Sequence, residues 1–212
     1  MTTAEPKWRR RKTARPTEIV AAALDVFAEK GFAAARLDEI AARAGVSKGA
    51  LYLYFATKDD LFRAVVREAV TPNIDAARAM AQAFPGRFQD LAPLLLARVA
   101  QIATVSRAPD VAKMVIGESH NFPDLARVWH DTVVSQAIGL VTDLIARAQA
   151  RGEVRPGDPR LHALSLMGPM VAGMFWRTVF EPVGAAPLDL AALAAQHART
   201  VLHGMLAEPR PA

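Results

Sequence analysis

Apolar side chains recur with the period of an α-helix along most of this chain, and no segment shows the sustained alternation of a β-strand. From Thr17 onward, Val20, Leu24 and Phe27 fall on one helical face, and glycines and prolines then divide the chain into further helical segments. We therefore predict an all-α fold of about nine helices. The expected helices cover residues 17–30, 37–44, 47–55, 58–84 with a kink or break at Pro72, 90–105, 109–117, 123–151, 158–180 and 188–206.

Positive charge is concentrated at the N-terminal end. The formal net charge is +5, and residues 1–63 hold 12 Lys/Arg against 8 Asp/Glu, whereas the remainder is almost balanced. Such an excess is expected where a protein meets a polyanion. Residues 1–15 are expected to form a mobile basic arm, or alternatively a solvated tail without a partner. The basic residues of this segment are Lys7, Arg9, Arg10, Arg11, Lys12 and Arg15.

Composition narrows the class of protein. Apolar residues make up 52% of the chain, enough for a substantial core, and the absence of cysteine excludes disulfides and thiolate chemistry. The longest apolar run, Leu166–Trp176, is too short to span a bilayer. Glu18 and Asp25 interrupt the stretch after the N-terminal arginines, which argues against a signal peptide. We expect a soluble, cytoplasmic protein with no membrane partner.

A short turn, Ala44-Gly45-Val46-Ser47, joins the second and third predicted helices. A tight, glycine-containing turn between two short helices is typical of a helix-turn-helix. Ser47 is a good cap for the third helix, as Thr57 is for the fourth. The third helix would present Ser47, Lys48, Gly49 and Tyr52 outward, which are side chains suited to a major groove and its phosphates.

Residues 19–62 closely resemble the DNA-binding region of TetR-type regulators. The resemblance rests on Ile40-Ala41, on the run Ala44-Gly45-Val46-Ser47-Lys48-Gly49, and on Leu51-Tyr52, Tyr54-Phe55, Lys58 and Leu61-Phe62 at fixed offsets. It implies that Ser47, Lys48, Gly49 and Tyr52 meet DNA, and that Tyr54 and Lys58 contact phosphates. The sequence departs from the family pattern at Arg36, where a capping Thr or Ser is usual. We expect Arg36 to replace the phosphate contact but not the cap.

The region 60–207 is apolar and nearly neutral. Its composition predicts a helical core, and the resemblance implies that it also holds a ligand cavity and a dimer interface. The candidate ligand-binding residues are Phe84, Leu95, Val99, Met114, Glu118, Trp129, Met170 and Met174, with Glu118 expected at the pocket mouth. In the family the last two helices pair with their copies, and the alternative is burial within one monomer. The candidate dimer-interface residues are Leu164, Gly168, Ala172, Phe175, Ala194, Ala198, Val201 and Met205.

These features predict a sequence-specific transcriptional regulator, a repressor released from a palindromic operator by a small apolar or amphipathic ligand. The expected division is a basic arm (1–15), a DNA-binding domain (16–60), a ligand-binding and dimerisation domain (61–207) and a tail (208–212). Gly45-Val46-Ser47-Lys48-Gly49 also fits a hydrolase G-x-S-x-G motif, but that motif needs a preceding strand. We predict no enzyme activity, catalytic residue, cofactor or metal site. An architectural DNA-binding protein without an effector, and an enzyme on a helical scaffold, remain alternatives.

Overall fold

The computed structural model describes residues 11–207 of the chain. The predicted basic arm lies outside the described residues up to position 10, and the tail 208–212 lies outside them entirely. The first helix begins at Arg11 rather than at the predicted Thr17, so the backbone of residues 11–15 is helical. Within the described residues the structure is built from helices, which confirms the all-α prediction.

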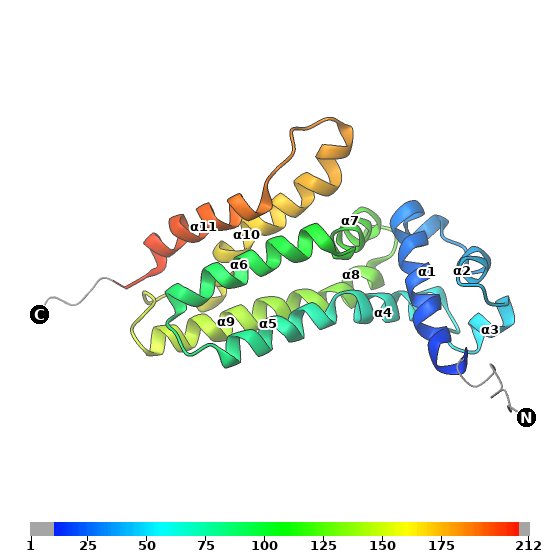
Figure 1. Ribbon diagram of the computed structural model, residues 1–212, viewed down its shortest axis with the longest axis horizontal. Coiled ribbons are helices and arrows are strands. Elements are labelled where there is room, and N and C mark those ends of the chain that lie inside the picture. The colour runs from blue at the N-terminus through cyan, green and yellow to red at the C-terminus, as the bar shows by residue number, and fades with distance from the viewer. Residues whose placement is uncertain (1–10, 208–212) are drawn as a thin grey trace, which may run out of the picture.

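The N-terminal unit comprises three helices and the start of a fourth, seen at the right of Figure 1. Its helices are α1 (Arg11–Ala34), α2 (Leu37–Arg43), α3 (Lys48–Tyr52) and α4 (Lys58–Ala69). Ser47 and Thr57 cap α3 and α4 as predicted, and Thr57 forms a reciprocal capping box with Asp60. Gly31 interrupts α1 with a φ of +78°, and one further helical turn follows it.

The remaining helices form an elongated body (Figure 1). They are α5 (Thr71–Ala83), α6 (Phe88–Val105), α7 (Ala108–Glu118), α8 (Pro123–Trp129), α9 (Ser135–Ala150), α10 (Pro159–Phe175) and α11 (Leu190–Met205). A π-helical turn, η1 (His130–Val134), joins α8 to α9, and η2 (Trp176–Phe180) with η3 (Glu181–Val183) extends α10. The predicted break at Pro72 is confirmed, since α4 ends at Ala69 and Pro72 lies in the first turn of α5.

Two apolar cores hold these helices together. The first joins α1–α4 to α7 and α8, and it is centred on Phe27, Phe32 and Phe62, whose rings pack with centroids 5.5 to 6.2 Å apart. Phe122, just before α8, adds an edge contact to Phe32 at 5.3 Å. The core of the N-terminal unit therefore continues into the body, so the two parts cannot move independently without disturbing shared packing.

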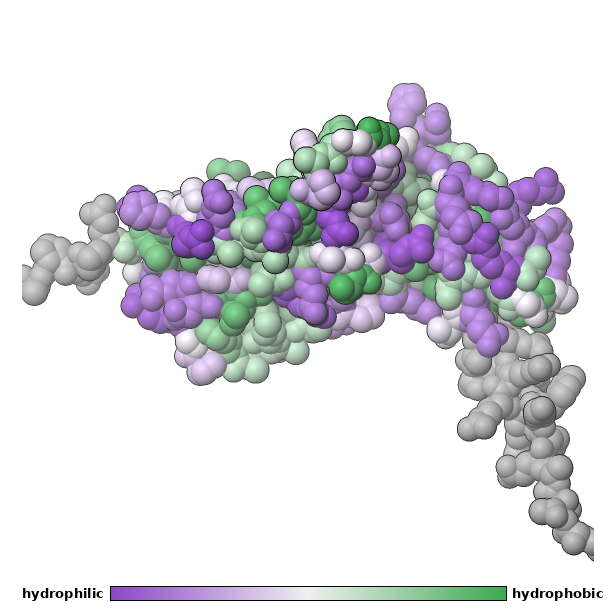
Figure 2. All heavy atoms as spheres, turned by 45° about the horizontal axis from the view of Figure 1, so that its top comes forward, coloured by the Kyte–Doolittle hydropathy of each residue, from purple (hydrophilic) through white to green (hydrophobic). Residues whose placement is uncertain are grey.

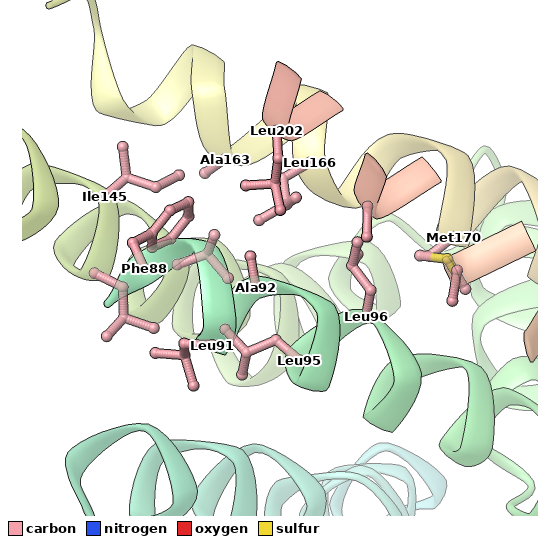
Figure 3. Packing of buried hydrophobic residues seen from close by; sticks show 14 of the residues in the cluster. Phe88, Leu91, Ala92, Leu95, Leu96, Ile145, Ala163, Leu166, Met170 and Leu202 are labelled. Atoms are coloured by element: carbon pink, nitrogen blue, oxygen red, sulfur yellow. The ribbon is translucent and has the colours of Figure 1, made fainter. Parts of the chain in front are cut away.

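The second core fills the body between α5, α6, α9, α10 and α11. Figure 3 shows Phe88 and Ile145 facing Ala163 in this core, and Leu96 lying toward Met170 farther along α10. The inward stripe of α11 packs here against α6 and α10. Its members are Leu190, Ala194, Ala198, Leu202 and Met205.

One face of α10 is not covered by any of the residues that the structure describes. Leu161, Leu164 and Val171 are exposed on α10, and Trp176 and Phe180 are exposed on its extension. In the part of the chain that the structure describes, Pro159–Val183 is also a stretch whose length and composition would allow it to cross a membrane. An exposed apolar stripe of this kind is typical of an interaction surface.

The N-terminus of α2 lacks a side-chain cap, as the sequence predicts. Arg36 occupies the N-cap position in an extended conformation, with φ −111° and ψ 135°, and makes no capping hydrogen bond. A serine at this position can accept a hydrogen bond from the third backbone N–H of the helix. We expect Arg36→Ser to raise the free energy of unfolding by about 1 kcal/mol over Arg36→Ala, measured by urea denaturation. Equal stabilities of the two variants, which lose the same charge, would contradict this reading.

Candidate functional site

The turn between α2 and α3 fixes the orientation of α3. Gly45 adopts a φ of +66°, which only glycine takes readily, and Val46 N–H then donates to Ala41 O at 3.0 Å. Ser47 Oγ accepts from Ala50 N at 3.1 Å. Leu51 is fully buried against the core that contains Ile40, so the opposite face of α3 points to solvent.

That outward face carries the residues predicted from the sequence. Tyr52 is 44% exposed and Tyr54 is 40% exposed. A Cβ added at Gly49 would meet open space, so packing within the chain does not require a glycine there. The sequence analysis missed Leu53, which is 84% exposed at the end of α3. An apolar side chain in this place is suited to contact a thymine methyl group. Hydrophilic surface covers much of the N-terminal unit, at the right of Figure 2.

Lys48 is paired with a carboxylate that the sequence analysis also missed. Its Nζ lies 2.8 Å from Asp38 Oδ1 on α2, and Arg36 Nη2 lies 3.9 Å from the other oxygen of Asp38. The hydrogen bond with Lys48 holds the pKa of the Asp38 carboxyl below its usual value and raises the pKa of Lys48. Both cations are exposed, so a phosphate or a guanine can compete with Asp38 for them.

Lys58 is engaged inside the N-terminal unit. Its Nζ donates to the backbone oxygens of Phe32, Ala33 and Ala35 at 2.6, 3.1 and 3.1 Å, and it lies 4.5 Å from the centre of the Phe32 ring. Burial lowers the pKa of this ammonium group, while the nearby Glu118 and Asp59 oppose the shift. Three acceptors match the three hydrogens of an ammonium group, so a phosphate contact would have to replace one of them.

The sequence analysis predicted Glu118 at a pocket mouth, whereas the structure directs its carboxylate to backbone N–H groups of the N-terminal unit. Its Oε1 accepts from Phe32 N at 2.6 Å and its Oε2 from Ala33 N at 2.7 Å. The carboxylate of the last residue of α7 therefore binds the backbone of the last turn of α1. The sequence could not reveal a contact between residues 85 and 86 positions apart.

The other predicted ligand-binding residues do not converge on one cavity. Leu95 and Met170 are buried in the second core, and Val99, Met174 and Phe84 pack at its edge. Met114 and Trp129 belong instead to the first core. The predicted residues are all apolar, but they belong to two different cores. The helical periodicity of the sequence indicates which side chains are buried, but it does not indicate which other residues they contact.

A cavity of about 480 Å³ opens where the end of α5 and the start of α6 face α9. Phe84, Phe88 and Leu144 form apolar walls, and Arg147 and Arg151 line one side. Arg151 is bound to Glu153, with Nε and Oε1 2.6 Å apart. Among the described residues the guanidinium group of Arg147 has no hydrogen-bonding or ion-pair partner. The cavity thus combines apolar surface with one guanidinium group available to an anion.

The predicted dimer residues also divide into two groups. Leu164, Gly168 and Ala172 are exposed on α10, and Phe175 and Val201 are half-buried. Ala194, Ala198 and Met205 are buried inside the monomer, so they cannot form an interface surface and that part of the prediction is wrong. The stripe was read correctly, but the neighbour that covers it is α6 together with α10.

Two family models match the chain. Residues 19–65 match the model of bacterial regulatory proteins of the tetR family, and residues 93–207 match the C-terminal domain of AefR-like transcriptional repressors. The chain belongs to the TetR family. The first match covers the turn and α3, and the second covers most of the body, which confirms the family predicted from the sequence.

Curated relatives of this TetR-family protein include two regulators matched over part of their length. The chain is 42% identical over 64 residues to the HTH-type transcriptional activator FasR of Mycolicibacterium smegmatis, covering 30% of this chain and 29% of FasR. It is 30% identical over 138 residues to the HTH-type transcriptional regulator RutR of Escherichia coli K12, covering 65% of this chain and 57% of RutR. The chain thus spans less than two thirds of the length of these relatives.

Solved structures share the fold. A TetR-family regulator from Mesorhizobium loti superposes with a TM-score of 0.78 at 22% identity, covering 92% of this chain and 98% of that one. FadR from Bacillus subtilis, solved in complex with stearoyl-CoA, gives a TM-score of 0.76 at 21% identity, with 89% and 98% coverage. The arrangement of the N-terminal unit on the helical body is therefore shared with these solved structures.

The exposed face of α3 predicts the effect of two substitutions on DNA binding. We expect Lys48→Ala and Tyr52→Ala each to weaken binding by about tenfold or more, on a DNA fragment that the wild-type protein selects from a random pool. Arg160→Ala is the matched control, because it removes a cation at the first turn of α10 and should leave affinity unchanged. Unchanged titrations for both α3 variants would refute the assignment of the recognition helix.

Proposed function

We propose that this protein is a sequence-specific DNA-binding repressor that inserts α3 into the major groove of an operator. The observation that carries the proposal is the outward face of α3, where Lys48, Gly49 and Tyr52 lie on a helix fixed by the Gly45 turn. The choice of repressor is supported by the match of residues 93–207 to an AefR-like repressor domain. Arg36, Ser47 and Tyr54 would add phosphate contacts that set the register on the duplex.

The protein acts as a homodimer in this proposal. The exposed stripe of α10, with Leu164, Gly168 and Ala172, would pack against the same stripe of a second copy around a two-fold axis. The small residues at two of these positions permit close approach of the helices. A two-fold dimer presents two copies of α3, and matching successive major grooves requires a separation of about 34 Å or a multiple of it. The operator would then be a palindrome.

The effector in this proposal is an amphipathic anion that occupies the cavity between α5, α6 and α9. A volume of about 480 Å³ falls within the usual range of ligand pockets. The apolar walls would hold a hydrocarbon part, and Arg147 would bind a carboxylate or phosphate group. Support also comes from FadR of Bacillus subtilis, whose structure contains stearoyl-CoA, an apolar chain with an anionic headgroup.

The roles of the two domains in this proposal are those predicted from the sequence. Residues 16–60 read DNA, and residues 61–207 bind the effector and the second copy. The protein works in the cytoplasm, where its DNA lies, and it catalyses no reaction. Its relatives are transcriptional regulators, which supports this assignment.

A charge on the exposed stripe should separate the dimer. We expect wild-type protein to sediment as a dimer at micromolar concentration and to protect two half-sites in a footprint. Ala172→Glu should sediment as a monomer and lose the footprint, because two carboxylates would face each other across the two-fold axis. Ala146→Glu, at an exposed position on α9, is the control for added charge. A wild-type monomer, or a dimer unaffected by Ala172→Glu, would overturn the assembly.

The proposed effector site makes a prediction about ligand charge. We expect decanoate to bind and to raise the melting temperature of the wild-type protein, because a ligand specific for the folded state stabilises it. Arg147→Gln should weaken decanoate binding by about tenfold, as expected when a charged hydrogen bond is lost. The same variant should leave binding of the neutral analogue decanol unchanged, and Arg160→Gln should alter neither. Equal loss of both ligands in Arg147→Gln would contradict the role assigned to its charge.

A further inference from the structure

The segment 31–35, which comprises the last turn of α1 after the kink at Gly31 and the residue that follows it, is held from two sides by side chains of opposite charge. From α7, the Glu118 carboxylate accepts the N–H groups of Phe32 and Ala33 at 2.6 and 2.7 Å. From α4, the Lys58 ammonium donates to the carbonyls of Phe32, Ala33 and Ala35. These backbone groups lie at the end of α1, where helices leave carbonyl groups without partners. The segment leads directly into Arg36, the N-cap of α2.

The glycine at position 31 is required by this arrangement. Its φ of +78° disfavours any other residue. A Cβ built there would also clash with Glu118 Oε1. The backbone therefore turns so that the carboxylate can reach two consecutive N–H groups. Two short hydrogen bonds to an anion are stronger and more directional than ordinary backbone pairs.

Other polar contacts between the N-terminal unit and α7 are weaker. Arg107, just before α7, pairs with Asp25 of α1 at 3.1 Å, but both side chains are about half exposed. Exposed pairs of this kind contribute little to stability and are screened by salt. Within the described residues, Glu118 is therefore the polar group best placed to fix the angle between the N-terminal unit and the body.

α7 is also tied to the extension of α10. Lys113 Nζ donates to Thr178 O in η2 at 2.9 Å. Thr178 lies between the exposed Trp176 and Phe180, next to the stripe proposed to meet the second copy. One helix thus touches both the DNA-reading unit and the end of α10. A shift of α7 relative to α10 would move Glu118 and the segment 31–35 with it.

We propose that Glu118 is a positioning residue for DNA binding, which orients α2 and α3 relative to the body through the backbone of residues 32 and 33. This inference rests on the proposed DNA-binding function and gives Glu118 a role other than ligand recognition. Without the carboxylate, the shared aromatic core still joins the two parts, but their relative angle is no longer fixed by directed bonds. The two copies of α3 in a dimer would then spend less time at the groove spacing.

The test compares Glu118→Ala, Glu118→Gln and the control Glu68→Gln. Glu68 is an exposed carboxylate on α4 without a hydrogen-bonding partner among the described residues, so its change to Gln matches the chemistry at position 118. Because the chain has no cysteine, Leu53→Cys and Val105→Cys introduce two spin-label sites, one on the N-terminal unit and one on the body. Both positions are highly exposed, at 84% and 75%. Doubly labelled chains are diluted with unlabelled protein, and label distances are measured by pulsed electron spin resonance without DNA.

We expect a narrow distance distribution in the wild type and in Glu68→Gln, and a broad or shifted one in Glu118→Ala. In unlabelled protein, Glu118→Ala should bind the selected DNA at least about tenfold more weakly, the change expected when hydrogen bonds to a charged group are lost. Glu118→Gln should fall between them, because its amide retains one acceptor oxygen. A merely structural role would lower the melting temperature but leave the distances of the folded protein unchanged.

Two outcomes would overturn the inference. One is a folded Glu118→Ala variant with wild-type distances and wild-type DNA affinity. If Glu118→Ala does not fold, the other is a Glu118→Gln variant that matches the control in both measurements. Failure of the proposed DNA-binding function would give a different result. In that case the wild-type protein would select no DNA, while the label distances would still change in the Glu118 variants.

Discussion

The structure depends on how the backbone N–H and carbonyl groups at the end of α1 find hydrogen-bonding partners. Gly31 interrupts the helical backbone just before residues 32 to 35, and Phe32 and Ala35 in this stretch are buried in the first core. Glu118 supplies acceptors for two N–H groups, and Lys58 supplies donors for three carbonyls. An anion from α7 and a cation from α4 thus supply hydrogen-bonding partners to one short stretch of backbone, and the backbone dipoles in turn stabilise both charges.

This junction explains why the DNA-reading unit is not an independent domain in packing terms. Its core continues into α7 and α8, while α4 runs on toward α5 through the break at Pro72. The second core holds α6, α9, α10 and α11 as the body. In the proposed function, a ligand near α9 and a second copy on α10 would act on a body whose contacts with the N-terminal unit pass through α4, α7 and α8. Small displacements of packed helices, rather than unfolding, suffice to alter the spacing of two recognition helices.

The local features of the fold could be predicted from the sequence, and the long-range ones could not. Gly45, Ser47 and Thr57 act within a few residues of their own positions, so their turn and caps were predicted correctly. Glu118 and Ala198 were misassigned because the sequence shows a carboxylate or an apolar stripe but not its distant neighbour. Ala198 is covered by the monomer itself, and Glu118 meets a backbone 85 positions away. Asp38 and Leu53 were missed because surface side chains leave no periodic signal.

The central claim is that effector binding and DNA binding both depend on the relative position of the N-terminal unit and the body. The affinity for the effector and the affinity for DNA must therefore be linked. The most direct test is the dissociation constant of decanoate, measured by titration calorimetry with and without the DNA that the protein selects. Linkage requires DNA to weaken decanoate binding by the same factor by which decanoate weakens DNA binding. Our account predicts equal factors greater than one. Identical decanoate affinity in the presence and absence of DNA would contradict it.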